Sequence, residues 1–378
     1  MKSNYDVLGN YIRLIDTRNK DNVTNKVVGI NIDKFFMPSV ANVIGTDLSK
    51  YKLITKGKFA CNPMHVGRDE RLPVALYEED KPALVSPAYF MFEIIDNNVL
   101  DENYLMMWFR RAEFDRICWL HTDGSVRGGI TWDDICRMEL PIPDIGEQRK
   151  MVEAYKIVEE RINLKRRIND NLEVQVTAIY HSLFDEQSEW SKGFVSDFGE
   201  VVGGATPSKK IGEYFCSDGI VWLTPKDLTS TTKKFIYKGE TDITDVAYQS
   251  CSTKILPKGS VLLTSRAPVG CVAIAMTDLC TNQGFKSIVP FKEIGTAYVY
   301  YFLKENRQLL ESHSSGTTFM EISGNVLKTI PVSIPPEELT QKFTSLCQPI
   351  FTYQEQIEAE IDQLIELQRT MVRRISSR

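Results

Sequence analysis

The chain has 378 residues, of which 43% are hydrophobic and 25% charged, so it is long enough for two or three globular domains. Its formal net charge of −5 excludes a strongly basic nucleic-acid protein, and any DNA contact must come from local basic loops or from a partner. No apolar run approaches the ~18 residues of a membrane span, and the N-terminus has no apolar signal region, so we expect no membrane contact and a cytoplasmic location.

The first globular segment carries a mixed pattern of strands and helices. Runs of β-branched or aromatic residues bounded by Gly, Pro or Asn predict strands over 27–32, 58–61, 74–76 and 89–95. A helix is predicted over 102–111. Thr131 is placed to cap a short helix, with Asp133 and Asp134 in its first turn, and residues 138–142 are expected to be extended.

A long amphipathic helix is predicted over residues 147–184, which contain neither proline nor glycine. Its apolar side chains recur mostly at three- and four-residue steps: Val158, Ile162, Ile168, Leu172, Val176, Ile179 and Leu183. This spacing places one apolar stripe along the helix. At ~1.5 Å per residue the helix is ~57 Å long, so a single small domain is too short to cover the stripe.

The second half repeats this pattern after a polar connection over 184–196. Strands are predicted over 220–223, 261–264, 272–275 and 287–290, and a helix over 296–304. Ser323 can cap a short helix before an extended stretch at 329–334. A second long amphipathic helix is predicted over 337–375 from the apolar residues Phe343, Leu346, Ile350, Tyr353, Ile357, Ile361, Leu364, Leu367, Met371 and Ile375.

The two halves of the chain align with each other as an internal repeat. At one constant offset, His121 pairs with His313, Thr131 with Ser323, and Pro143 with Pro335. Further upstream, at drifting offsets, Leu8-Gly9 pairs with Phe198-Gly199, Gly57 with Gly259, Val66-Gly67 with Val269-Gly270, and Tyr104-Leu105 with Tyr298-Val299. The matches keep the same order in both halves, which makes chance a poor explanation.

The repeat predicts an α/β (α+β) fold of two globular domains separated by two long antiparallel coiled-coil helices, with an internal pseudo-twofold relation. The expected boundaries are 1–146 for the first globule, 147–186 for the central helix, 187–336 for the second globule and 337–378 for the C-terminal helix. The competing interpretation is that each helix packs only against its own globule.

Signatures of catalysis and metal binding are missing from the sequence. There is no G-x-x-x-x-G-K-[ST] loop, since residues 203–210 have glycines and lysines at the wrong spacing, and no G-x-G-x-x-G follows a strand. The segment Asn62-Pro63-Met64-His65 lacks the second proline and the aromatic ring of an amino-methyltransferase loop. The eight cysteines and four histidines show no zinc-ligand spacing. We therefore expect reduced thiols, no metal, no cofactor and no catalytic site.

Polar and basic loops supply the groups that contact DNA phosphates and base edges. The candidates in the first half are Arg18, Asn19, Lys20, Asn62, Arg68, Arg71, Ser125 and Arg127. The candidates in the second half are Ser208, Lys209, Lys210, Lys226, Lys233, Lys234, Arg266, Asn282, Gln283, Lys286, Ser315, Thr317 and Thr318. Polar loops are more often simply solvated, so both interpretations stay open for each single residue.

Four segments carry a recognisable pattern: LPIPDIGEQRKMV at 140–152, GEVVGGATPS at 199–208, VWLTPKDL at 221–228 and NQGFK at 282–286. With them, essentially the whole chain resembles the specificity subunit of Type I restriction–modification systems. The second junction departs from the pattern, because Thr340-Gln341 stands where the first has Glu147-Gln148. The first globule also lacks the Thr-Pro-Ser and Asn-Gln-Gly-Phe segments.

The resemblance implies a non-catalytic subunit whose two globules are target-recognition domains. Each would read one half of a split site on double-stranded DNA, and the helices would set the gap between the half-sites. Similar subunits bind two methyltransferase subunits, which methylate adenine with S-adenosylmethionine, and recruit restriction/translocase subunits. Two alternatives stay open: a self-sufficient methyltransferase or nuclease with a divergent site, and a two-globule adaptor that binds proteins rather than DNA.

Overall fold

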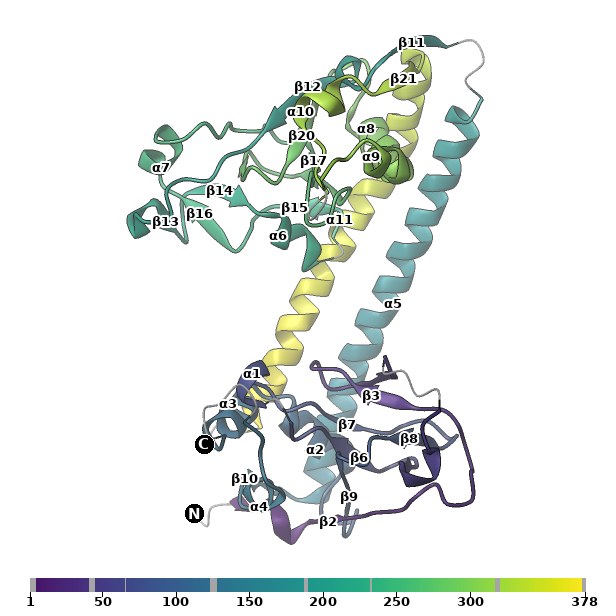
Figure 1. Cartoon of the computed structure of the whole chain (residues 1–378), viewed down its shortest axis with the longest axis vertical. Coiled ribbons are helices and arrows are strands. Elements are labelled where there is room, and N and C mark those ends of the chain that lie inside the picture. The colour runs from purple at the N-terminus through teal and green to yellow at the C-terminus, as the bar shows by residue number, and fades with distance from the viewer. Residues whose placement is uncertain are drawn as a thin grey trace. The chain divides into compact units, whose positions relative to one another are not determined.

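The computed structural model describes residues 5–40, 45–64, 66–122, 128–186, 190–231, 233–316 and 320–375. The chain forms two compact units: unit 1 comprises Met1–Asn163 and Gln363–Arg378, and unit 2 comprises Leu164–Asp362. The long helices α5 (Ile145–Phe184) and α11 (Glu337–Arg374) each contribute to both units (Figure 1). Within the described ranges, no helix combines the length and the apolar character that crossing a membrane requires.

Unit 1 is built on an antiparallel sheet with the strand order β2-β9-β6-β7. Its strands are β1 (Tyr5–Val7), β2 (Ile12–Leu14), β3 (Val28–Ile30), β4 (Phe36–Pro38), β5 (Lys52–Ile54), β6 (Phe59–Cys61), β7 (Val74–Leu76), β8 (Ala83–Val85), β9 (Phe90–Ile94) and β10 (Glu139–Pro141). Its shorter helices are α1 (Val66–Asp69), α2 (Glu102–Phe109), α3 (Ala112–Leu120) and α4 (Trp132–Cys136). Strand β1 pairs with β10, directly before α5 begins.

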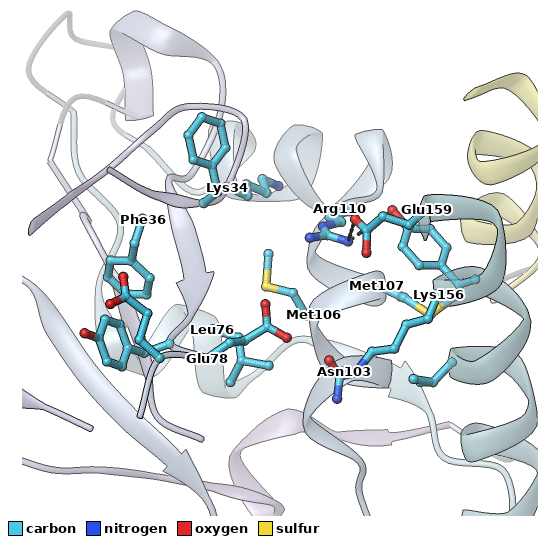
Figure 2. A pocket seen from close by; sticks show the side chains of 15 residues that line it. Lys34, Phe36, Leu76, Glu78, Asn103, Met106, Met107, Arg110, Lys156 and Glu159 are labelled. Carbon is cyan, nitrogen blue, oxygen red and sulfur yellow. Dashed lines mark hydrogen bonds and ion pairs between the residues drawn. The ribbon is translucent and has the colours of Figure 1, made fainter. Parts of the chain in front are cut away.

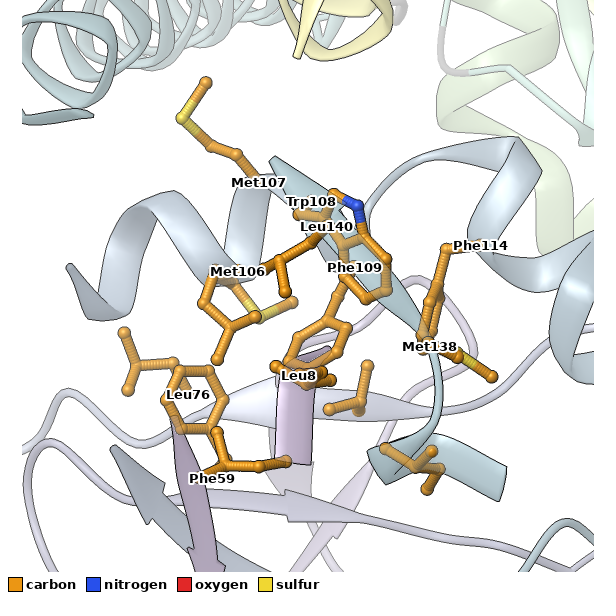
Figure 3. Packing of buried hydrophobic residues seen from close by; sticks show 14 of the residues in the cluster. Leu8, Phe59, Leu76, Met106, Met107, Trp108, Phe109, Phe114, Met138 and Leu140 are labelled. Atoms are coloured by element: carbon orange, nitrogen blue, oxygen red, sulfur yellow. The ribbon is translucent and has the colours of Figure 1, made fainter. Parts of the chain in front are cut away.

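The core of unit 1 lies between this sheet and α2, a helix that is buried over its last two turns because residues 104–109 are all apolar or aromatic. Phe59 of β6 stacks on Phe92 of β9 with ring centroids 5.1 Å apart, and Phe109 of α2 meets both rings edge-on. Figure 3 shows Phe59 and Phe109 in this core. The start of α5 and the end of α11 join the same buried cluster through Tyr155 and Val372.

Unit 2 contains a sheet of order β12-β20-β17-β18-β15 and a second sheet of order β13-β16-β14-β19. Its strands are β11 (Ser191–Phe194), β12 (Gly199–Gly203), β13 (Phe215–Cys216), β14 (Ile220–Leu223), β15 (Phe235–Ile236), β16 (Thr241–Ile243), β17 (Val261–Leu263), β18 (Val272–Ala275), β19 (Cys280–Thr281), β20 (Lys286–Pro290) and β21 (Pro331–Ile334). Its shorter helices are α6 (Pro225–Thr229), α7 (Asp245–Gln249), α8 (Thr296–Glu305), α9 (Arg307–Ser312) and α10 (Gly324–Lys328).

The two units share one topology, which confirms the predicted repeat. The order β2-β9-β6-β7 in unit 1 matches β12-β20-β17-β18 in unit 2, with antiparallel neighbours in both. Thr131 and Ser323 cap the short helices α4 and α10, as predicted. The polar connection over 184–196 contains β11, which pairs with β21.

One predicted pair of the repeat, Leu8-Gly9 with Phe198-Gly199, is wrong by three residues. The backbone N–H of Leu8 donates to the carbonyl of Met138, and the N–H that makes the equivalent bond in unit 2 belongs to Val195. The two glycines are therefore unrelated. Gly9 allows a close approach to Cys136, whereas Gly199 allows β12 to approach β20.

Within unit 2, the two long helices run antiparallel, as the sequence predicted. The Lys165 ammonium lies 2.6 Å from the Glu360 carboxylate, and further along α5 the ring of Tyr180 lies 5.8 Å from the ring of Phe343. Position therefore rises along α5 while it falls along α11. Both helices also pack on the globular part of the unit, so the competing interpretation is correct in part: Phe343 and Tyr180 belong to its main buried cluster.

Candidate nucleic-acid interface

Several of the predicted segments of unit 2 converge on one surface. The reading cluster comprises Thr206, Ser265, Arg266, Gln283, Lys286 and Glu321. The hydroxyl of Thr206 donates to the side-chain oxygen of Gln283. The ammonium of Lys286 donates to the backbone carbonyl of Gln283 at 3.1 Å. Loops that are separated by more than a hundred residues in the sequence thus present their polar groups together.

Glycines and an asparagine shape the loops of the reading cluster. The side-chain oxygen of Asn282 accepts a hydrogen bond from the N–H of Gly284 at 2.8 Å and closes a tight turn. A Cβ atom on Gly284 would lie 2.7 Å from the ring of Pro225, and one on Gly204 would lie 2.1 Å from the carbonyl of Thr281. Only glycine permits both approaches, so the 204–206 loop packs closely on the 281–284 turn.

Two cations and one carboxylate form the charged part of the reading cluster. A guanidinium nitrogen of Arg266 lies 3.5 Å from the Glu321 carboxylate, and the ammonium of Lys286 lies 3.7 Å from it. The Lys286 side chain is 17% exposed, whereas those of Arg266 and Glu321 are 35% and 38% exposed. Burial lowers the pKa of the Lys286 ammonium, and the Glu321 carboxylate offsets part of that shift.

The chemistry of the cluster suits base edges in a major groove. Arg and Lys donate to the acceptors of guanine, Gln pairs with adenine, and a carboxylate accepts from the amino group of cytosine. The sequence predicted Arg266, Gln283 and Lys286 but missed Glu321, because the predicted contacts are basic, amide and hydroxyl side chains and include no carboxylate. The available signal was the position of Glu321 directly before Ile322-Ser323, inside the repeat.

The other candidates of unit 2 fall into three groups. Ser208, Lys209, Lys210 and Ser315 are exposed. Lys226 pairs with Glu240 at 2.8 Å, and Lys233 pairs with Asp362 at 2.5 Å, so both ammonium groups already have carboxylate partners. Thr317 and Thr318 lie outside the described residues.

The prediction that Lys234 contacts DNA is wrong. Its side chain is 5% exposed, and its ammonium donates to Gln354 at 2.8 Å and to the hydroxyl of Tyr301 at 2.9 Å. It also forms an ion pair with Glu173. A side chain held on three sides inside the protein has no path to a base or a phosphate.

Several candidates of unit 1 form contacts with residues of the same unit. Arg18 donates to the carbonyl of Lys50, Asn62 accepts from the N–H of Met64, Arg68 pairs with Asp69, and Lys20 is exposed. Ser125 and Arg127 lie outside the described residues. The prediction for Asn19 is wrong, because its buried amide donates to the carbonyl of Thr24 at 3.1 Å and accepts from the N–H of Val23 at 2.8 Å.

Arg71 lies on an arginine-rich cleft of unit 1. It pairs with Asp33 at 3.1 Å and lines a cleft of about 930 Å³. Five further arginines line the same cleft: Arg110, Arg111, Arg116, Arg369 and Arg373. Guanidinium groups are well suited to phosphate oxygens. The sequence did not indicate this cleft, because two of its arginines come from the end of α11, almost three hundred residues beyond Arg71.

Residues 187–367, which include the whole reading cluster, match the sequence profile of the Type I restriction modification DNA specificity domain. This match covers just under half of the chain. Over 42% of its length, the chain is 44% identical to the Type I restriction enzyme MjaIX specificity subunit of Methanocaldococcus jannaschii, and the match spans 37% of that relative.

The likeness extends beyond the specificity domain. The chain is 22% identical to the Type I restriction enzyme HindI specificity subunit of Haemophilus influenzae, over 91% of the chain and 92% of that relative. The crystal structure of the Type I restriction-modification system S subunit from M. genitalium is similar over 99% of this chain and 96% of that one, with a TM-score of 0.60 and 13% identity. At that identity, the structural likeness supports the fold alone.

Proposed function

We propose that the chain is the sequence-specific DNA-recognition subunit of a Type I restriction–modification complex, and that it reads a bipartite site on double-stranded DNA. The observation that carries this proposal is the convergence of Arg266, Gln283, Lys286 and Glu321 on one surface of the specificity domain. These groups recognise base edges, and their contacts with one another hold them in place before DNA binds.

Each globule is a target-recognition domain for one half-site, since both units have the same sheet order. In unit 2 the reader is the reading cluster. In unit 1 the arginine-rich cleft supplies phosphate contacts that position the domain, while its base-reading residues come from the polar loops. The domain limits follow the sequence plan: globules at 1–146 and 187–336, and spacer helices at 147–186 and 337–378.

The subunit itself is non-catalytic, and its partners supply the chemistry. Two methyltransferase subunits bind S-adenosylmethionine and modify the DNA, and restriction/translocase subunits complete the complex. Two features support this division of labour: the sequence has no nucleotide or S-adenosylmethionine motif, and the formal net charge of −5 is consistent with partners that provide part of the phosphate-binding surface.

The experiment that tests the proposal is DNA binding by the chain reconstituted with its methyltransferase subunits. Methylome sequencing of a host that expresses the complex first identifies the site. The complex should then prefer that site over a scrambled duplex, and Arg266→Ala should weaken binding by about 1–3 kcal/mol, with relaxed preference in one half-site only.

Lys258→Ala is the matched control, because Lys258 is an exposed lysine of the same unit outside the reading cluster. It should leave the preference unchanged. A complex with no preference between cognate and scrambled sites would contradict the proposed function. An equal loss across unrelated sequences in the Arg266 variant would assign that residue to a phosphate instead of a base.

A further inference from the structure

A second set of polar side chains lies in the interior of unit 2 around Lys234 and shares no residue with the reading cluster. The register cluster comprises Lys234, Glu173, Tyr301, Gln354 and Glu358. Lys234 precedes β15 in the globular part of the unit, Tyr301 belongs to α8, Glu173 to α5, and Gln354 and Glu358 to α11. The Lys234 ammonium therefore joins the globular part of unit 2 to both long helices.

The register cluster also connects the two helices directly. The side-chain amide of Gln354 donates to the Glu173 carboxylate at 3.2 Å and to the backbone carbonyl of Asn169 at 3.4 Å. The contact is specific for one axial position, because a slip of one turn moves a helix by about 5.4 Å. After such a slip, Glu173 would no longer reach Gln354, and Lys234 would be left buried without its carboxylate.

The globular part of unit 2 also contacts α11 through its backbone. The carboxylate of Glu358 accepts hydrogen bonds from the N–H groups of Lys234 and Phe235, at 2.9 and 3.3 Å. The ring of Phe235 packs edge-on against Phe351, about one turn before Gln354 on α11, with centroids 5.8 Å apart. The start of β15 is thus attached to one defined stretch of the helix.

The pKa values of the charged groups in the register cluster are shifted by burial and by their neighbours. Burial raises the pKa of the Glu173 carboxyl, but Lys234 and Lys304 outweigh this effect and bring it to about 2. Burial lowers the pKa of Lys234, and Glu173 opposes that shift. Glu358 also faces Lys234, and burial raises its pKa. The Glu173 carboxylate is therefore the ionised partner of the buried lysine.

In unit 1, the globular part is joined to α5 by a different kind of contact. There Arg110 of α2 donates to the hydroxyl of Tyr155 at 3.0 Å and lies 3.7 Å from Glu159, both on α5 (Figure 2). The Arg110 and Glu159 side chains are 32% and 42% exposed, and both line a cavity of about 230 Å³. An ion pair at the edge of an open cavity defines position less strictly than a buried one.

We propose that Lys234 is a positioning residue: the register cluster fixes the axial register of α5 against α11 at the second reader and thereby sets the gap between half-sites that the complex accepts. This inference rests on the proposed function. Its physical basis is that a buried polar group with partners on several elements penalises every other alignment, as polar residues do in coiled coils.

The test replaces the charged centre by apolar side chains of similar size, Lys234→Met with Glu173→Leu, because such exchanges in a protein interior are often tolerated. The reconstituted complex is measured on duplexes whose half-sites are separated by the cognate gap and by gaps one or two base pairs longer or shorter. One or two steps of about 3.4 Å are comparable with a slip of one helical turn. Each half-site should still be read, but the preference for the cognate gap should fall at least about tenfold.

Two further variants complete the experiment. Tyr237→Phe is the matched control, since it removes an exposed hydrogen bond from the same segment to Glu355 of α11. It should keep the gap preference. Gln354→Met removes the hydrogen bonds that Gln354 makes to α5 and to the Lys234 ammonium but keeps the Lys234–Glu173 ion pair, and it should lower the preference even if the double variant does not fold.

Unchanged gap preference in a folded double variant or in folded Gln354→Met would overturn the inference. A loss of stability together with an intact gap preference would also overturn it, because the cluster would then be only a structural contact. Failure of the proposed function looks different: the unmodified complex itself would show no sequence preference at any gap.

Discussion

At the scale of single residues, two lysines of unit 2 differ in what their side chains can reach. Lys286 keeps 17% of its side chain exposed beside Glu321, on the surface that carries Arg266. Lys234 keeps 5% and is enclosed by two long helices and the globule. In the sequence both are basic residues in polar loops, but only Lys286 is available to DNA. Burial, and not charge, distinguishes the proposed reading residue Lys286 from the proposed positioning residue Lys234.

A pH prediction follows from Glu173. Burial alone would raise the pKa of this carboxyl, but Lys234 and Lys304 depress it from 4.5 to about 2. A carboxyl whose pKa is depressed in the folded state contributes stability above its unfolded pKa, and this stability is lost as the pH falls through the folded value. Chemical denaturation should therefore show a difference in unfolding free energy between wild type and Glu173→Gln that is about 1–3 kcal/mol above pH 4.5 and shrinks towards pH 2.

Glu160→Gln is the control for this measurement, because Glu160 is an exposed carboxylate of the same helix. Its difference from wild type should be small and nearly constant over the same range. A difference for Glu173→Gln that stays constant with pH would contradict the depressed pKa. Burial raises the pKa of the Glu358 carboxyl, which is present in both proteins.

At the scale of elements, the starts of α5 and α11 are anchored by different side chains at equivalent positions. Gln148 of α5 is buried, accepts from the N–H of Asp101 at 2.9 Å and donates to the carbonyl of Val99 at 2.8 Å. Thr340 of α11 is also buried, and its hydroxyl donates to the carbonyl of Glu293 at 2.6 Å. The apparent departure of the second junction is therefore a substitution of one hydrogen-bonding side chain for another.

The stability of unit 2 should depend on Thr340 more than on its neighbour Gln341. Thr340→Val keeps the shape of the side chain but leaves the carbonyl of Glu293 without its donor, and should cost about 1–2 kcal/mol in unfolding free energy. Gln341→Ala removes an exposed amide and should cost less than about 0.5 kcal/mol. Thermal denaturation of the two variants checks this. Equal effects of the two substitutions would contradict the assignment of Thr340 as the counterpart of Gln148.

At the scale of the whole molecule, the chain repeats one plan: a sheet of the same order, a capped short helix, a β-strand pair and then a long helix. Both long helices contribute to both units. A subunit that reads a split site needs two readers and a spacer of defined length, and helices supply that length because their rise per residue is constant.

The length of α5 should control the gap between half-sites. Four residues inserted after Asn163 lengthen the helix by about 6 Å, and the reconstituted complex should then accept a different gap when it is tested on duplexes of varied spacing. Four residues inserted after Asp80, in the exposed loop between β7 and β8, are the control and should leave the gap unchanged. If the α5 insertion also leaves the gap unchanged, the helices are not the spacer.

The sequence by itself determined the elements that depend on local pattern. Strands over 74–76, 220–223 and 272–275 coincide with β7, β14 and β18, and both long helices begin and end within two residues of their predicted limits. Periodicity and capping depend on residues that are close together in the sequence, so they can be recognised before the tertiary structure is known. The repeat and the resemblance to specificity subunits rest on the same local information.

Only the tertiary structure decided which polar side chains are available to a ligand. Glu321 joined the reading cluster and Lys234 left the set of predicted DNA contacts, because their surroundings come from distant parts of the chain. The partners of Lys234 lie 61 residues before it and 67 to 124 residues after it. Burial is a sum over such distant neighbours, and no local pattern contains it.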